Sequence, residues 1–310
     1  YKMNATKELI TNFVAGSAGG TACVYCGQPL DTIKVKLQTF PSLYKNAFDC
    51  FRSTLKTEGI YGLYKGSVPA LVCNVSENAV LFVALGYMKS LVGSIRHKRP
   101  DDLSNLENAS AGSLASIFSA MVVCPTELIK CRMQAMTELQ LNWHKKVGVK
   151  IFSGTKDVCG PWGVLRSMIK TNGILSPFEG LTSTWVREMP GYFLFFYGYE
   201  FTRGALASKG QSKDDIEAWK TVIAGGTAGL FLWVAIFPID VIKSRIQVLS
   251  AAGTQYGFTR TLKVVVQTEG LGALYNGLLP MIVRTYPANG ALFLAYEWAR
   301  KGFGGAIGLE

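Results

Sequence analysis

Residues 125–134 read PTELIKCRMQ and close an uncharged run that extends from Asn108 to Thr126. The stretch sets a proline, an acid, two bases and a glutamine at the end of an apolar segment. Proline removes a backbone hydrogen bond and kinks a helix. Charged side chains within a membrane helix must face protein or water rather than lipid. Neither a soluble helix nor a lipid-facing one favours this combination, so the stretch needs a structural reason.

The same pattern occurs three times along the chain. Residues 29–38 read PLDTIKVKLQ and residues 238–247 read PIDVIKSRIQ, so these three cassettes share the pattern Pro-x-acid-x-x-base-x-base-x-Gln. Each cassette is followed by a stretch that ends in glycine: EGIYGLYKG at 58–66, NGILSPFEG at 172–180 and EGLGALYNG at 269–277. Internal similarity of this kind is the signature of a repeat architecture. The sequence predicts one domain, residues 1–310, made of repeats at 7–96, 104–209 and 216–303.

Each repeat contains two apolar segments of membrane-spanning length. The first segments are uncharged over Leu9–Leu30, Asn108–Thr126 and Thr221–Ile239, and the second lie at 67–93, 181–206 and 278–300. A helix needs about 20 residues to cross the apolar core of a bilayer. A shorter amphipathic stretch separates the two segments, as in NAFDCFRSTLKTEG at 46–59. The sequence therefore predicts six spanning helices, with both termini on one side of the membrane.

The composition agrees with a membrane protein. The mean hydropathy is +0.21 and 17% of the residues are charged, below the roughly 25% of soluble domains. The alternative of a soluble helical-repeat scaffold is disfavoured, because three such uncharged segments on its surface would make the protein insoluble. The net charge of +11 is best explained by loops and anchors beside anionic lipid. Nucleic-acid binding is not expected, because the bases do not gather with aromatic residues on one polar module.

Several other function classes lack their signature residues. The seven cysteines are an odd number and are scattered, so they do not form a disulfide framework. Only two histidines are present, which argues against a zinc site at Cys23 and Cys26. We find no nucleophile–base constellation, phosphate loop or metal-ligand spacing, so no enzymatic activity, cofactor or metal is expected. The start of the chain, YKMNATKELI, does not have the layout of a cleavable signal peptide.

The three cassettes and the three glycine stretches together resemble the mitochondrial carrier family. The resemblance covers nearly the whole chain, with the motifs in register. It implies an all-α barrel of six transmembrane helices with threefold pseudosymmetry in the mitochondrial inner membrane, and three short amphipathic helices on the matrix face. It also implies a monomer that exchanges metabolites through a central site. Because helix N-termini bind phosphate groups, we expect cardiolipin near the turn Tyr64-Lys65-Gly66.

The resemblance further implies two gates made of ion pairs. On the matrix side, kinks at Pro29, Pro125 and Pro238 would make the helix ends converge. The expected pairs are Asp31 with Lys130, Glu127 with Lys243, and Asp240 with Lys34, braced by Gln38, Gln134 and Gln247. The expected cytoplasmic gate consists of Lys89, Glu200, Arg203, Glu297 and Arg300. This second gate should be weaker, because Leu85 and Gly86 replace the aromatic residue and the acid in the first repeat.

The residues that select the substrate should be those that differ between repeats. We aligned the second segments on Gly66, Gly180 and Gly277. Ionisable residues then lie seven to eleven positions further on, about 10–17 Å deep at ~1.5 Å per residue, and such groups are functional candidates. The candidate substrate contacts are Glu77, Arg187, Glu188 and Arg284, with Asn74 and Asn78 beside Glu77.

Two acids and two bases suit a ligand that carries both signs of charge. An arginine can bind an α-carboxylate through two hydrogen bonds. Glu188 is then available for the α-ammonium and Glu77 for a second cation, which predicts ornithine, lysine or arginine as substrate. The Arg-acid pair in WVREMPGYF at 185–193 is similar to that of family members for amino acids. YPANGALFLAYE at 286–297 resembles the ornithine branch of the family, which exchanges ornithine for citrulline or a proton and serves the urea cycle. The alternatives are a general basic amino-acid carrier, a carnitine-type carrier with aromatic walls, and a proton leak.

Overall fold

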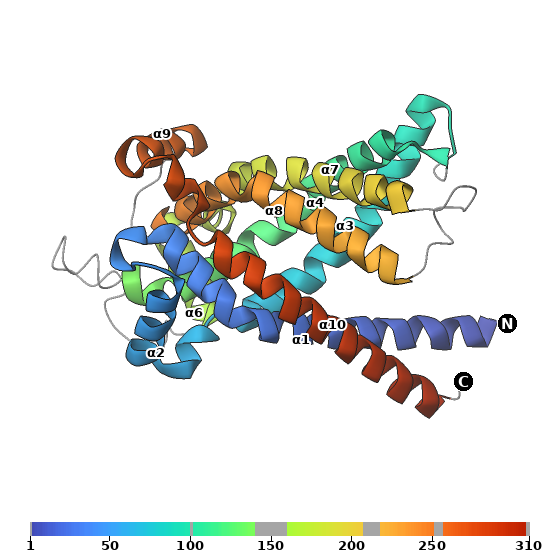
Figure 1. Cartoon of the computed structure of the whole chain (residues 1–310), viewed down its shortest axis with the longest axis horizontal. Coiled ribbons are helices and arrows are strands. Elements are labelled where there is room, and N and C mark those ends of the chain that lie inside the picture. Colours follow the sequence, from blue (N-terminus) through green and yellow to red (C-terminus); the bar gives the residue numbers. More distant parts are fainter. Residues whose placement is uncertain (1, 100–101, 140–159, 207–217, 251–256, 308–310) are drawn as a thin grey trace. The chain divides into compact units, whose positions relative to one another are not determined.

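The computed structural model describes residues 2–99, 102–139, 160–206, 218–250 and 257–307, and it shows one helical pattern that recurs along the chain (Figure 1). A long helix is followed by a short helix and then by a second long helix. The long helices are α1 (Lys2–Thr39), α3 (Ser67–Arg96), α4 (Asn105–Gln134), α7 (Leu181–Leu206), α8 (Ala218–Leu249) and α10 (Leu278–Ile307). The short elements are η1 (Pro41–Leu43), α2 (Ala47–Leu63), α6 (Pro161–Asn172), η4 (Ser176–Phe178), α9 (Phe258–Glu269) and η7 (Leu271–Tyr275). No strand occurs in these described ranges.

The cassette prolines lie inside helices rather than at their ends. Pro29 lies within α1, Pro125 within α4 and Pro238 within α8, and each helix continues through its cassette. Membrane helices tolerate an internal proline because neighbouring groups satisfy the freed backbone carbonyl. The acid and the first base of a cassette, such as Asp31 and Lys34, are three residues apart. They therefore lie on the same face of a continuous helix.

Two of the long helices are apolar enough over their described residues to cross a membrane. These are α3 and α4, with mean hydropathies of 1.7 and 1.5 over their most apolar windows. On α3 the exposed apolar side chains include Val68, Val72 and Val75, and on α4 they include Leu114 and Phe118. Residues three and four positions apart share a helix face. Both helices thus present an apolar stripe of the kind that faces lipid in a bilayer.

The chain forms two compact units whose boundaries cut across the repeats. The first unit comprises residues 1–75, 126–173 and 276–310, and the second comprises residues 76–125 and 174–275. In the first unit, α1 lies alongside α10 and packs against α2 (Figure 1). In the second unit, α7 lies alongside α8, and α9 and η7 pack against α8. In the first unit, helices from the two ends of the chain are therefore neighbours, whereas the contacts of the second unit join helices that follow one another in the sequence.

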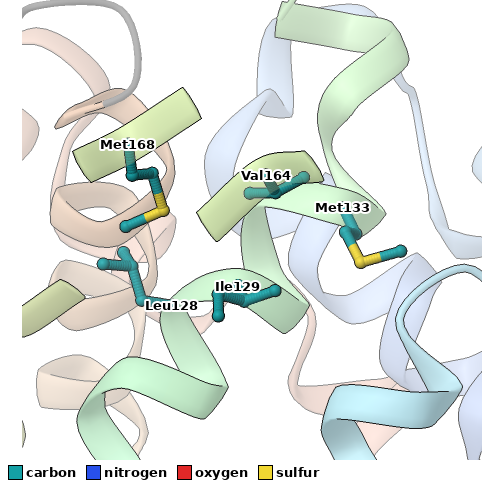
Figure 2. Close-up of a cluster of buried hydrophobic side chains, with 5 residues drawn as sticks. All are labelled: Leu128, Ile129, Met133, Val164 and Met168. Carbon is teal, nitrogen blue, oxygen red and sulfur yellow. The ribbon is translucent and has the colours of Figure 1, made fainter. Parts of the chain in front are cut away.

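Each short helix packs against the end of the long helix that precedes it. Figure 2 shows this packing for α4 and α6, where Leu128, Ile129 and Met133 lie near Val164 and Met168. The equivalent clusters join Ile33 and Leu37 to Cys50 and Leu63, and Ile242 to Val265, Ala273 and Leu274. Fully burying one such isoleucine stabilises the fold by about 1.5–3 kcal/mol. The isoleucine four residues after each cassette proline thus anchors a short helix in all three repeats.

The glycine that precedes each second long helix has a left-handed backbone conformation. The φ angles are +82° at Gly66, +85° at Gly180 and +91° at Gly277. A Cβ atom on Gly66 would lie 3.1 Å from the carbonyl oxygen of Lys130, and one on Gly277 would lie 3.2 Å from that of Lys34. Conformation and close approach both require glycine. Gly66 thereby abuts the cassette of the second repeat, and Gly277 abuts that of the first.

Replacing Gly66 by alanine should lower the free energy of unfolding by about 1–3 kcal/mol, because the new side chain strains the backbone and crowds Lys130. Thermal unfolding in detergent would measure the loss. Gly86→Ala is the matched control, because Gly86 lies within α3 and a Cβ atom added there would meet no heavy atom within 4 Å. Equal melting temperatures for the two variants would contradict the role given to Gly66.

Candidate functional site

Asp31 is the centre of an ionic cluster in the first unit. Lys130 Nζ on α4 lies 2.7 Å from its Oδ2 atom, and Arg284 Nε on α10 lies 2.8 Å from its Oδ1 atom. Asp31 itself is only 7% exposed. A Cβ atom on Gly27 would collide with the Arg284 guanidinium, so glycine there makes room for it. The expected contact between Asp31 and Lys130 is present, whereas the contact with Arg284 was not expected from the sequence.

Amide and hydroxyl side chains hold the backbone around this cluster. Gln134 Nε2 donates to Thr32 Oγ1 at 3.1 Å, and Thr32 Oγ1 donates to the carbonyl oxygen of Leu63 at 2.8 Å. Gln28 Nε2 donates to the carbonyl oxygen of Lys65 at 2.9 Å. The three cassette glutamines Gln38, Gln134 and Gln247 are fully buried. The hydrogen bonds of Gln28, Thr32 and Gln134 fix the register of the first cassette against its neighbours.

A second ionic cluster lies in the second unit around Glu188. Arg187 contacts the Glu188 carboxylate, and its Nε atom lies 3.3 Å from Asp240 Oδ1. Lys243 Nζ lies 3.5 Å from Glu188 Oε1 and is almost fully buried. The guanidinium of Arg187 also stacks over the ring of Trp233, 5.4 Å from its centroid. Trp233 was not identified from the sequence, because nothing in its spacing distinguishes it from a packing residue.

The two clusters have the same plan. Arg187 and Arg284 each lie seven residues after the glycine that opens their helix, and each contacts a cassette acid, Asp240 or Asp31. The first repeat has Cys73 at this position. The arrangement therefore links the predicted substrate residues directly to the predicted gate. It occurs once in each unit, so two of the three repeats carry an arginine at this position.

Glu77 is hydrogen-bonded to Tyr192, which the sequence suggested only as an aromatic residue that could line a carnitine-type site. The hydroxyl of Tyr192 on α7 donates to Glu77 Oε1 at 2.7 Å, and both residues belong to the second unit. The other repeats carry Asn78 and Asn289 at the position of Tyr192. That exchange of asparagine for tyrosine is the sequence signal that could have identified it. A phenol that donates to a carboxylate fixes the direction in which the second oxygen can bind a cation.

The remaining substrate and matrix-gate candidates are only partly placed. Asn74 Oδ1 lies 3.2 Å from the position of a Cβ atom on Gly20, so this side chain packs against α1. Asn78 is exposed on α3. The two other expected ion pairs, Glu127 with Lys243 and Asp240 with Lys34, would join residues of different units, and they stay predictions.

The expected cytoplasmic gate also stays a prediction. The side chains of Glu200 and Arg203 lie outside the described residues. Glu297 contacts Lys301 one turn further along α10 at 3.7 Å, and both side chains are well exposed. Exposed pairs of this kind contribute about 0–1 kcal/mol. Arg300 is exposed and Lys89 is partly buried.

Comparison with known proteins gives a match over almost the entire chain. The family model described as "Mitochondrial carrier protein" matches three times, at residues 5–95, 101–210 and 214–306. "Mitochondrial ornithine transporter 1" of Rattus norvegicus is 48% identical over 301 residues, which is 97% of both chains, and that of Mus musculus is 47% identical. "Mitochondrial carnitine/acylcarnitine carrier protein" of Homo sapiens is 33% identical over 300 residues, 94% of both chains.

Proposed function

Because the chain belongs to the mitochondrial carrier family, we propose that it exchanges a basic amino acid, foremost ornithine for citrulline or a proton, across the mitochondrial inner membrane. The observation that carries the proposal is that one unit contains both Glu77, which is bound by Tyr192, and the Arg187–Glu188 pair. The relatives support the same substrate, since the ornithine transporters are 47–48% identical to the chain and the human carnitine carrier is 33% identical. The protein is a multi-pass inner-membrane transporter.

The substrate α-carboxylate is proposed to bind the arginines. Arg187 and Arg284 offer fork-shaped donors that match a carboxylate in plane and spacing. In the present structure these arginines contact Asp240 and Asp31. An incoming carboxylate at either arginine competes with the aspartate that contacts that guanidinium group. Substrate binding would thus supply the differential energy that loosens a cassette contact and shifts the conformational equilibrium.

The two carboxylates divide the cationic groups of the substrate between them. Glu188 lies next to Arg187 in the sequence and contacts its side chain, so it can take the α-ammonium beside the α-carboxylate. Glu77 takes the distal ammonium, with Tyr192 holding one of its oxygens. Citrulline has a neutral ureido group in place of that ammonium. The difference between the two exchanged substrates is therefore assigned mainly to Glu77.

The helices are proposed to form the six-helix barrel of the family, with α2, α6 and α9 on the matrix face. The cassettes would close the matrix side through Asp31, Lys34, Glu127, Lys130, Asp240 and Lys243. The cytoplasmic side would be closed by Lys89, Glu200, Arg203, Glu297 and Arg300. The modest net stability of buried ion pairs suits a gate that must open in each cycle. Cardiolipin near Lys65 and a monomeric state remain part of the proposal.

Competition in liposomes tests the choice of substrate. The purified protein is reconstituted in liposomes that are loaded with ornithine. These are exposed to labelled ornithine together with unlabelled ornithine, lysine, arginine or carnitine outside. Strong competition by ornithine and weaker competition by the longer basic amino acids is expected, although one methylene contributes only about 1–3 kcal/mol to discrimination. Competition by carnitine alone would favour the carnitine-type carrier instead. Proton conductance without amino-acid uptake would favour the leak.

Replacing Tyr192 by phenylalanine should raise the KM for ornithine about three- to tenfold, because the Glu77 carboxylate loses one hydrogen bond and its fixed orientation while it keeps its charge for the ammonium. The rate at saturating ornithine should change little. Initial rates of uptake over a range of ornithine concentrations would measure both parameters. Tyr197→Phe, further along α7, is a control that removes a hydroxyl from the same helix. An unchanged KM for the Tyr192 variant would show that the hydroxyl does not position Glu77.

A further inference from the structure

Lys36 lies between two carboxylates from different repeats. Its side chain is completely buried and contacts Glu58 on α2, in its own repeat. Its Nζ atom also lies 2.7 Å from Oε1 of Glu138, which follows α4 in the second repeat. Thr54 Oγ1 accepts a third hydrogen bond from the same ammonium at 3.2 Å. The ammonium of Lys36 is thus shared between an acid within its repeat and an acid across a repeat boundary.

Glu138 is bound from a second direction by Tyr44. The Tyr44 hydroxyl donates to the same Oε1 atom at 2.6 Å. Burial, together with this bond to Glu138, raises the pKa of Tyr44, so the phenol keeps its proton and remains a donor. The side chain of Glu138 is only 4% exposed. A buried carboxylate held by an ammonium and a phenol is an ordered contact rather than a surface ion pair.

The contact belongs to a short seam between the first two repeats. Thr137 Oγ1 accepts a hydrogen bond from Lys65 at 3.3 Å, and Gln134 donates to Thr32 at 3.1 Å. Residues 134–138 of the second repeat are therefore bonded to side chains of the first repeat at three successive points. This seam lies just beyond the cassette cluster of Asp31 and Lys130, and all of these residues lie in the first unit.

The pair within the repeat is a repeated feature, whereas the contact across the boundary is not. Arg245 corresponds to Lys36, and it binds Glu269 of its own repeat at 2.5 and 2.7 Å through two hydrogen bonds. Thirteen residues after each cassette proline the sequence has Ser42, Glu138 and Ala251. Only the second repeat thus carries an acid at this position. Glu58 and Glu269 each bind a base of their own repeat and so hold a short helix in place. Glu138 instead adds a link between repeats.

We propose that Glu138 is a positioning residue that locks the first and second repeats together on the cassette side of the carrier. The inference rests on the proposed transport function, because opening on this side must separate the repeats. Lys36 and Tyr44 would then lose Glu138, while Lys36 keeps Glu58 throughout the cycle. The lock biases the carrier towards the state that is closed on the cassette side, and it does so at one of the three repeat boundaries.

The test compares Glu138→Gln with Glu58→Gln, since each removes one carboxylate from Lys36 and only Glu138 crosses the boundary. The reporter is a Gln38→Cys substitution at a fully buried position, which reacts with an impermeant maleimide, added from the cassette side, when this side opens. Mass spectrometry of the peptide that contains residue 38 gives the labelling rate. In Glu138→Gln this labelling rate should rise at least about fivefold, because the equilibrium between the closed and the open state of the cassette side shifts towards the open state. Tyr44→Phe should give a smaller rise in the labelling rate.

The control separates a lock from a general loss of stability. Glu58→Gln should lower the melting temperature without a comparable rise in labelling of residue 38. Equal labelling in the Glu58 and Glu138 variants, or unchanged labelling in both Glu138→Gln and Tyr44→Phe, would overturn the proposal. Ornithine uptake by the unmodified protein is measured separately. Failure of that uptake would refute the proposed function, whereas the labelling needs no substrate and still decides the lock.

Discussion

Replacing Glu77 by glutamine is expected to slow ornithine uptake by about tenfold to a hundredfold. A hydrogen bond to a charged group contributes about 1.5–3 kcal/mol, and the variant loses this contribution for the distal ammonium. Glutamine is nearly the same size and its amide oxygen can still accept from Tyr192, so the fold should be retained. Initial rates of labelled ornithine uptake into ornithine-loaded liposomes would measure the effect.

The same variant should affect citrulline much less, because citrulline has no distal charge. The ratio of ornithine to citrulline uptake should therefore fall by nearly the same factor as ornithine uptake itself. Asp102→Asn provides a matched control, since it makes the same chemical change at an exposed carboxylate that contacts exposed Arg99. If Glu77→Gln leaves the ratio unchanged, Glu77 does not bind the distal ammonium.

Replacing Arg284 by lysine should reduce uptake of ornithine and citrulline alike, by about tenfold or more. Lysine keeps the charge but cannot offer a planar fork to a carboxylate. The loss concerns the α-carboxylate, which both substrates carry, and also the contact with Asp31 at 2.8 Å. Uptake of each substrate by the variant would be compared with wild-type uptake at equal protein content, and a melting curve would confirm folding.

Arg260→Lys on the exposed side of α9 is the matched control for that exchange. It should leave both uptake rates near those of the wild-type protein. The two variants should therefore differ in their effect on uptake. Glu77→Gln should slow mainly the uptake of ornithine, whereas Arg284→Lys should slow the uptake of ornithine and citrulline alike. Normal uptake of both substrates by Arg284→Lys would remove Arg284 from the substrate site and from the control of the cassette.

The threefold cassette made most of the fold predictable. A proline, a paired acid and base, and a buried glutamine at fixed spacing recur because each repeat meets the same physical requirement. The same argument predicted the contact between Asp31 and Lys130, which the structure contains at 2.7 Å. The repeat also contains a glycine before each second long helix, and the positive φ angles of these glycines became evident only in the structure.

The contacts of long side chains could not be predicted in the same way. Arg284 reaches Asp31 from the far end of the chain, and spacing within one helix gives no information on such a reach. Tyr192 and Glu77 approach one another from different repeats. Glu138 lies beyond the end of its cassette and has no acidic counterpart in the other repeats, so the symmetry that made the cassettes predictable does not apply to it.

The most direct test of the central claim is uptake of labelled ornithine into liposomes that contain the pure protein and are loaded with ornithine, with citrulline or with buffer alone. We predict rapid uptake against internal ornithine or citrulline and much slower uptake against buffer. The slow component should depend on the proton gradient, because a proton is the alternative counter-ion. Absence of ornithine uptake under all three loadings would contradict the claim that this carrier exchanges basic amino acids.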